Sequence, residues 1–124
     1  MVVVTTGRVP EREISDALLS ADVYLHADHA GPSAGRRTSI VAALAHGMAL
    51  VSYSGPDHAE QLVDGANMLV VGDGAALAET LRALHIDPQR RAALGAAARA
   101  TFEQHFSWRV IGDAVSAVLE GAAR

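Results

Sequence analysis

The sequence has 124 residues, the size of one domain and long enough to bury a core of moderate size. Half of its residues are hydrophobic and 19% are charged, a balance that excludes an intrinsically disordered chain. The formal net charge of −4 argues against nucleic acid as a partner, and the lack of cysteine excludes disulfides and thiolate metal sites.

The beginning of the chain alternates short apolar runs with one helical pattern. Residues 2–5 are a β-branched run and predict a buried strand. Apolar side chains recur on one face of residues 14–19, which is typical of a short helix. Residues 23–27 predict a second strand, and residues 28–35, rich in glycine and other small residues, predict a loop.

The middle of the chain repeats this pattern. Residues 38–46 predict a mostly apolar helix, which ends before Gly47 as helices often do. A third strand is expected over residues 49–53 and a fourth over residues 68–71. Between them, residues 58–63 suggest a helical turn.

Three helices are expected in the last third of the chain, over residues 75–84, 89–105 and 107–120. Ser107 is a suitable N-cap for the last helix. Phe106 and Trp108 are expected to pack this helix onto the body.

Apolar strands that alternate with helices predict an α/β fold with a parallel sheet. We expect residues 1–124 to form one Rossmann-like domain, in which a doubly wound sheet of about four strands carries helices on both faces. No apolar run reaches the roughly 20 residues of a membrane-spanning helix, and the chain start lacks the pattern of a signal peptide. These features predict a cytoplasmic protein without a membrane span.

The order of several segments resembles a known family. These are TGRVPEREISDALLSADVYLHA, AALAHGMALVSYSGPDHAEQLVDGANMLVV, GDGAALAETLRAL and FSWRVIGDAV, in this order along the chain. Together they resemble the C-terminal nucleotide-sugar-binding domain of GT-B glycosyltransferases, and among these the retaining enzymes that include many bacterial polysaccharide transferases. The resemblance implies that the donor, a sugar on a nucleoside diphosphate such as UDP, is a substrate that binds at the carboxyl edge of the sheet, and that no further cofactor is needed.

The resemblance places the diphosphate at the start of the helix expected from residue 38. A helix N-terminus presents unpaired N–H groups and a partial positive charge, which favour an anion. We expect Gly35, Arg36, Arg37, Thr38 and Ser39 to form this site, with the arginines giving charge-assisted contacts to phosphate oxygens. The alternative is that one arginine is solvated and the other pairs with a nearby aspartate.

Two positions differ from the family pattern. Many members carry two glutamates that align with Ala34 and Ala42, where they serve the reacting centre and the ribose hydroxyls. Glu60 aligns with a third family glutamate and is the acid best placed to face the ribose, although it could instead stabilise a helix N-terminus. No catalytic residue is identified from the sequence.

The segment around His26, Asp28 and His29 is the part of the sequence most similar to a metal site. No second cluster completes the ligand set, so we expect no metal there and interpret these residues as polar groups near the donor site.

The family domain usually begins with a further strand, a glycine-rich turn and a basic helix, and follows an N-terminal acceptor domain. This chain starts after all of them. We therefore expect a domain fragment that lacks the acceptor domain and is inactive in sugar transfer alone, since closure of the two domains brings the reactants together. An exposed sheet edge would favour a homodimer.

Two further functions stay open. The chain could be a degenerate, non-catalytic α/β module that acts in dimerisation or assembly, because both glutamates are absent. A flavodoxin-like or receiver-like domain fits less well, since there is no early acidic cluster and no phosphate loop after the first strand.

Overall fold

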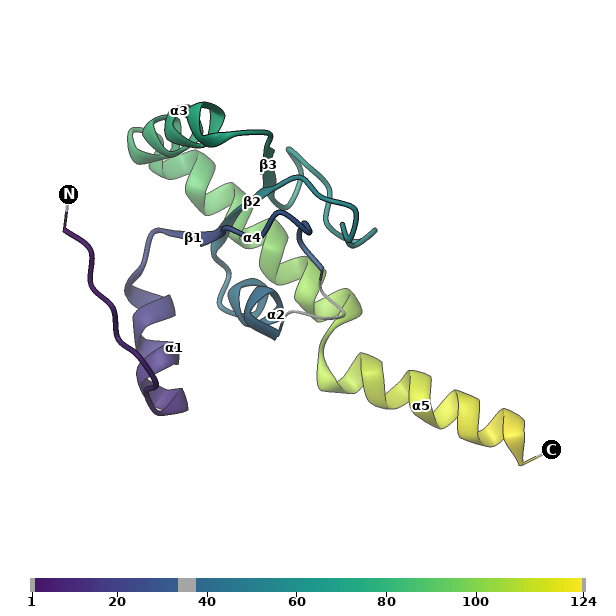
Figure 1. The fold of residues 1–124 in the computed structure, drawn as a ribbon. Helices are drawn as coiled ribbons and strands as arrows, with labels where there is room; N and C mark the ends of the chain where they lie inside the picture. Colours follow the sequence, from purple (N-terminus) through teal and green to yellow (C-terminus); the bar gives the residue numbers. More distant parts are fainter. Residues whose placement is uncertain (1, 34–37, 124) are drawn as a thin grey trace.

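The computed structural model describes residues 2–33 and 38–123. Its centre is a parallel sheet with the order β1-β2-β3, built from β1 (Val23–His26), β2 (Ala49–Tyr53) and β3 (Leu69–Val71) (Figure 1). The α/β class and the parallel sheet are confirmed. The expected number of about four strands is not, because the described residues form three.

Five helices are present in the described residues: α1 (Glu11–Ser20), α2 (Thr38–Ala45), α3 (Gly74–His85), α4 (Pro88–His105) and α5 (Trp108–Ala122). The last three begin at residues that cap them. The side chains of Asp73, Asp87 and Ser107 accept hydrogen bonds from the backbone N–H three residues later, at 2.8, 2.9 and 3.3 Å. Such caps satisfy donors that a helix leaves unpaired at its first turn.

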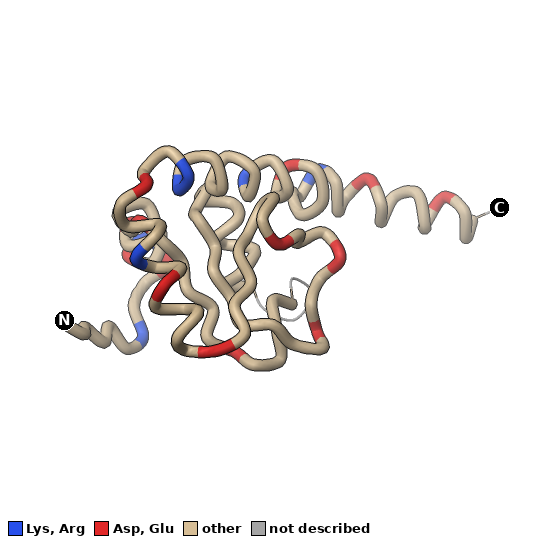
Figure 2. The backbone as a smooth tube through the Cα atoms, turned by 90° about the horizontal axis from the view of Figure 1, so that it is seen from above, with Lys and Arg blue, Asp and Glu red and all other residues tan. Residues whose placement is uncertain are grey.

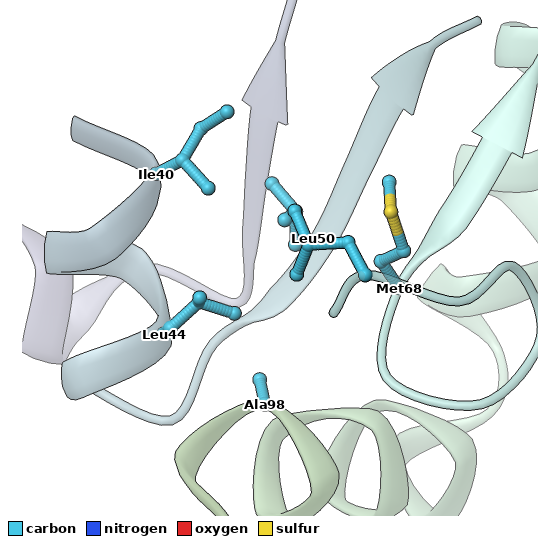
Figure 3. Packing of buried hydrophobic residues seen from close by; sticks show 6 residues of the cluster. Ile40, Leu44, Leu50, Met68 and Ala98 are labelled. Atoms are coloured by element: carbon cyan, nitrogen blue, oxygen red, sulfur yellow. The ribbon is translucent and has the colours of Figure 1, made fainter. Parts of the chain in front are cut away.

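The central strand β2 separates two hydrophobic clusters, because successive side chains of a strand point to opposite faces. Leu50 lies on one face with α2 (Figure 3). This first cluster consists of Ile40, Leu44, Leu50, Leu62, Met68 and Ala98. The second, on the opposite face, consists of Ala49, Val51, Leu69, Val71, Leu84 and Leu94. Helices therefore cover both faces, with α2 on one side, α3 on the other and α4 contributing to each cluster.

Two glycines bring the end of α2 against α4. A Cβ added to Gly95 would lie 2.2 Å from the carbonyl oxygen of Gly47. Gly47 itself has a φ of +65°, a conformation that favours glycine after a helix. Arg99 of α4 donates a hydrogen bond to the carbonyl of Ala45 at the same place. The two helices thus meet backbone to backbone, which only a residue without a side chain permits.

Residues 2–5 do not form the expected strand. They are extended but irregular, and Val2, Val3 and Val4 are 87%, 76% and 78% exposed. A strand needs a neighbour to satisfy its backbone N–H and C=O groups, and the described residues give this run none. Its β-branched composition is therefore not enough to form a strand.

The segment between β2 and β3 contains hydrogen-bonded turns rather than a helix. Asn67 organises it, because its side-chain oxygen accepts from the N–H of Val63 at 2.7 Å. Its amide donates to the carbonyl of Gln61 and to the hydroxyl of Thr101 in α4, at 2.8 and 2.7 Å. Asn67 is buried, so these bonds fix the loop to the body of the domain.

The first helix is held more loosely, since α1 has no buried residue. The Nδ1 atom of His46 lies 2.7 Å from the carbonyl oxygen of Ala42, and its Nε2 atom lies 2.8 Å from the hydroxyl of Ser15 in α1. A carbonyl only accepts, so Nδ1 carries the proton and Nε2 accepts from Ser15. This bond joins α1 to the end of α2.

The last helix extends away from the body (Figure 1), and α5 also has no buried residue. Trp108 is 86% exposed, so the expectation that it packs α5 onto the body is wrong. Phe106, just before α5, does pack against the first cluster. None of the helices in the described residues is long and apolar enough to cross a membrane.

Candidate functional site

The carboxyl edge of the sheet is where β1 and β2 end, at His26 and Tyr53. The loop after β1 leads to α2, which begins at Thr38. Ligands of open α/β sheets bind beyond the carboxyl ends of the strands, because the connecting loops and helix N-termini gather there. This edge is therefore the candidate site.

Two glycines make the loops at this edge touch. A Cβ added to Gly55, in the loop after β2, would lie 2.2 Å from the carbonyl carbon of Ala30, in the loop after β1. Gly31 has a φ of +95°, which is strained for any residue with a side chain. Both positions thus require glycine for the loops to meet.

Backbone hydrogen bonds hold the same two loops together. The N–H of Asp57 donates to the carbonyl of Ala30 at 2.7 Å, and the N–H of Ala59 donates to that of Pro32 at 2.9 Å. Glu60 follows directly in the chain. The segment that carries Glu60 is therefore fixed beside the loop that leads into α2.

The predicted site residues fall into three groups. Thr38 and Ser39 are the first described residues of α2 and are exposed, and the helix expected over this region is confirmed. Glu60 is exposed in a turn between β2 and β3. Gly35, Arg36 and Arg37 lie outside the described residues. Contact of any of them with a ligand stays a prediction.

The charges around the edge are distributed unevenly. Between Arg12 and Arg82 the sequence contains only two lysine or arginine residues, Arg36 and Arg37. In Figure 2 the blue arginine segments lie on helices and near the N-terminus, whereas red acidic segments also occur in the loops. In the loops after β1, β2 and β3 the acidic residues are Asp28, Asp57, Glu60, Asp64 and Asp73. Among the described residues, the loops at this edge therefore carry acidic side chains and no lysine or arginine, and the N-terminus of α2 contributes a partial positive charge.

The histidine-containing segment after β1 is used for packing. The ring of His29 lies 4.6 Å from that of Tyr53, centroid to centroid. Asp28 closes a turn, because its carboxylate accepts from the N–H of Ala30 at 2.9 Å. His26 is buried at the end of β1. In the part of the chain that the structure describes, no group of three or more histidine and acidic residues could hold a metal ion.

Two features of this edge have only weak signals in the sequence. Gly31 and Gly55 are recognisable as turn residues, but the contact between their loops joins positions 24 residues apart and has no local pattern. The sequence predicts His26 both as part of the strand over residues 23–27 and as a polar group near the donor site. Its position at the end of an apolar strand was the available signal for burial.

Comparison with known proteins now identifies the fold. Residues 2–115 match the model of the glycosyl transferase-like family. The chain is 29% identical, over 128 aligned residues, to a GDP-mannose-dependent monoacylated alpha-(1-6)-phosphatidylinositol monomannoside mannosyltransferase of Corynebacterium glutamicum. That alignment covers 95% of this chain and 32% of the relative, so the chain spans about a third of the enzyme's length.

Two crystal structures of HepE from Anabaena, one in complex with UDP and one with UDP-glucose, superpose with TM-scores of 0.74 and 0.72. Each match has 23% identity and covers 85% of this chain and 29% of HepE. With the sequence match over nearly its full length, the chain belongs to the glycosyl transferase-like family and fits the C-terminal domain of a GT-B glycosyltransferase.

Proposed function

We propose that residues 1–124 are the donor-binding part of a glycosyltransferase, which holds a nucleoside diphosphate sugar for transfer to an acceptor. The diphosphate lies at the start of α2 in this proposal, with Gly35, Arg36, Arg37, Thr38 and Ser39 around it and Glu60 facing the ribose. Support for the ligand class comes from HepE, whose structures hold UDP and UDP-glucose.

One observation carries the proposal. The helix α2 (Thr38–Ala45) lies with its first turn at the carboxyl edge, and in the sequence Arg36 and Arg37 directly precede it. These two are the only lysine or arginine residues between Arg12 and Arg82. A positive charge beside a helix N-terminus is unfavourable on its own, because the helix dipole is positive there too. A bound anion would remove this repulsion and accept charge-assisted bonds from both arginines.

A titration tests the proposal. UDP, GDP and ADP are added separately to the 124-residue chain, and binding is followed by calorimetry and by backbone amide NMR. We expect one of them to bind and to shift the amides of Thr38 and Ser39. The double variant R36A/R37A should weaken this binding by about tenfold or more, since each bond to a charged group contributes about 1.5–3 kcal/mol.

The control is Arg109→Ala, which removes an exposed arginine from α5. It should leave the affinity within about twofold. If no nucleotide shifts the first turn of α2, or if R109A weakens binding as much as the double variant, donor binding at this edge is wrong.

A further part of the proposal concerns activity. The chain is about a third as long as the mannosyltransferase and HepE that it matches. We propose that it binds the donor but does not transfer sugar alone, because the acceptor must be held opposite the donor and water excluded. The cysteine-free sequence supports a cytoplasmic location for this activity.

A second candidate function is a non-catalytic assembly module. Alanine at positions 34 and 42 favours it. So does the outer edge of β1, which pairs with no strand of the described residues and could pair with a strand of a second copy. This candidate predicts a dimer in light scattering together with no affinity for any of the three nucleotides.

A further inference from the structure

The imidazole of His26 has an unusual environment. Its side chain is 8% exposed, its Nε2 atom is fully buried, and no described residue forms a hydrogen bond with that atom. Other histidines differ, since His46 uses both ring nitrogens and the Nε2 atom of His58 lies 2.5 Å from the carbonyl oxygen of Leu62. Buried polar atoms are nearly always paired, so an unpaired one requires an explanation.

The register of the sheet places this imidazole on the face that α2 covers. Tyr24 pairs with Leu50 and His26 pairs with Ser52, so these four side chains share one face. Tyr24 packs against the first cluster, which includes Ile40 and Leu44 of α2. His26 thus lies between the sheet and α2.

The direction of α2 relative to the strands shows which end of the helix lies at the carboxyl edge of the sheet. Figure 3 shows Ile40 nearer the arrowheads of the strands and Leu44 nearer their starts. The first turn of α2 is therefore at the carboxyl edge, the end at which His26 closes β1. His26 and the first turn of α2 therefore lie toward the same edge and on the same face of the sheet.

The nearest hydroxyl in the register is already used. Ser52 is fully buried, and its hydroxyl donates to the carbonyl of Tyr53 at 3.0 Å. It does not donate to the imidazole. The Nε2 atom of His26 thus has no partner among the described residues, and the first N–H groups of α2, toward the same edge, have no partner within the helix.

We propose that His26 is a ligand-binding residue of the donor site, whose Nε2–H donates to a phosphate oxygen of the bound nucleoside diphosphate. This inference rests on the proposed function. A neutral imidazole protonated at Nε2 supplies one donor there, and the N–H groups of α2 supply others to the same anion. Since Nε2 is covered in the structure, the imidazole turns about its side-chain torsions toward the helix end when the ligand enters.

The loops beside it make such a movement local. The contact of Gly55 with Ala30 and the two hydrogen bonds from Asp57 and Ala59 fix the loop after β1. Residues 30–32 of this loop therefore keep their conformation in the proposal while the imidazole of His26 moves. A phosphate oxygen bound there would give the buried nitrogen the partner that it lacks.

NMR of the whole 124-residue chain with ¹⁵N-labelled histidine tests the proposal. The probes are UDP, inorganic pyrophosphate and uridine, and the readouts are the His26 Nε2 resonance and the amides of Thr38 and Ser39. We expect UDP and pyrophosphate to shift all three with one saturation curve and uridine to shift none. His85, exposed at the end of α3, should not respond.

The outcomes separate this inference from the proposed function. If the amides of Thr38 and Ser39 shift but His26 does not, the inference is wrong and the donor site stands. If uridine shifts His26 as UDP does, the contact is not with phosphate and the inference is also wrong. If neither the Nε2 resonance of His26 nor the amides of Thr38 and Ser39 respond to any probe, both proposals fail.

Variants provide a second test. His26→Leu removes the donor and should weaken UDP binding by about tenfold. His26→Gln keeps a donor near the position of Nε2 and should bind within about threefold of the original chain. Equal affinities of H26L and the original chain would overturn the proposal. His85→Leu is the matched control, and thermal unfolding of each variant shows whether it folds.

Discussion

Residues 2–5 and β2 are two apolar runs with nearly the same sequence signal and opposite environments. The first four residues of β2, Ala49 to Ser52, are all buried. Val2, Val3 and Val4 are 76–87% exposed. The difference is pairing, because β2 has a strand on each side and residues 2–5 have none in the described structure. A run with strand propensity becomes a strand only where a neighbour accepts its hydrogen bonds.

The largest expected effect is a difference in stability between two variants, each of which shortens one apolar side chain to alanine, one in β2 and one in residues 2–5. Leu50→Ala should lower the free energy of unfolding by about 2–5 kcal/mol, because it opens a cavity in a fully buried cluster. Val3→Ala should change it by less than about 0.5 kcal/mol, since nothing packs around an exposed side chain. Urea unfolding followed by circular dichroism measures both. A cost for V3A close to that of L50A would mean that residues 2–5 are buried in solution.

A second prediction compares the body with α5 through two glycines. Gly95→Ala should destabilise the domain by about 1–3 kcal/mol, because the new Cβ would lie 2.2 Å from the carbonyl oxygen of Gly47. Gly112→Ala in α5 meets nothing within 4 Å and should raise helix stability by up to about 1 kcal/mol. Thermal unfolding of both variants checks the signs. If G95A were as stable as G112A, the contact of α2 with α4 would not be as close as described.

The smallest effect concerns α1, which has no buried residue. Ser15→Ala removes the hydroxyl that donates to His46 and should cost about 0.5–1.5 kcal/mol. The loss should be local, so hydrogen exchange of α1 amides should accelerate while those of β2 stay protected. Asp16→Ala, exposed on the same helix, is the control. Equal acceleration in α1 and β2 would show instead that α1 unfolds together with the sheet.

Many local features of the fold could be predicted. Residues 49–53 form a strand with the expected bounds, and α2 covers Thr38–Ala45, within the helix expected there. Ser107 caps α5 as expected. These features depend on neighbours in the chain: an apolar run, a small polar residue at a helix start, a glycine at its end.

The candidate site was predictable in part. The expectation of a donor site at the carboxyl edge follows from the alternation of strands and helices together with the family resemblance. The burial of His26 had one local sign, its position at the end of an apolar strand, but nothing in the sequence indicated that its Nε2 atom has no hydrogen-bond partner. Nor did the sequence indicate the exposure of Trp108, whose aromatic side chain is typical of a core.

The sequence by itself thus determined the succession of strands and helices, their caps and the family to which the chain belongs. The tertiary structure alone decided which apolar runs pair, which glycines bring backbones into contact and which polar side chain is buried without a partner. The physical reason is the range of the interactions. Caps and turns depend on residues a few positions apart, whereas strand pairing, the contact of Gly47 with Gly95 and the burial of His26 join positions far apart in the chain.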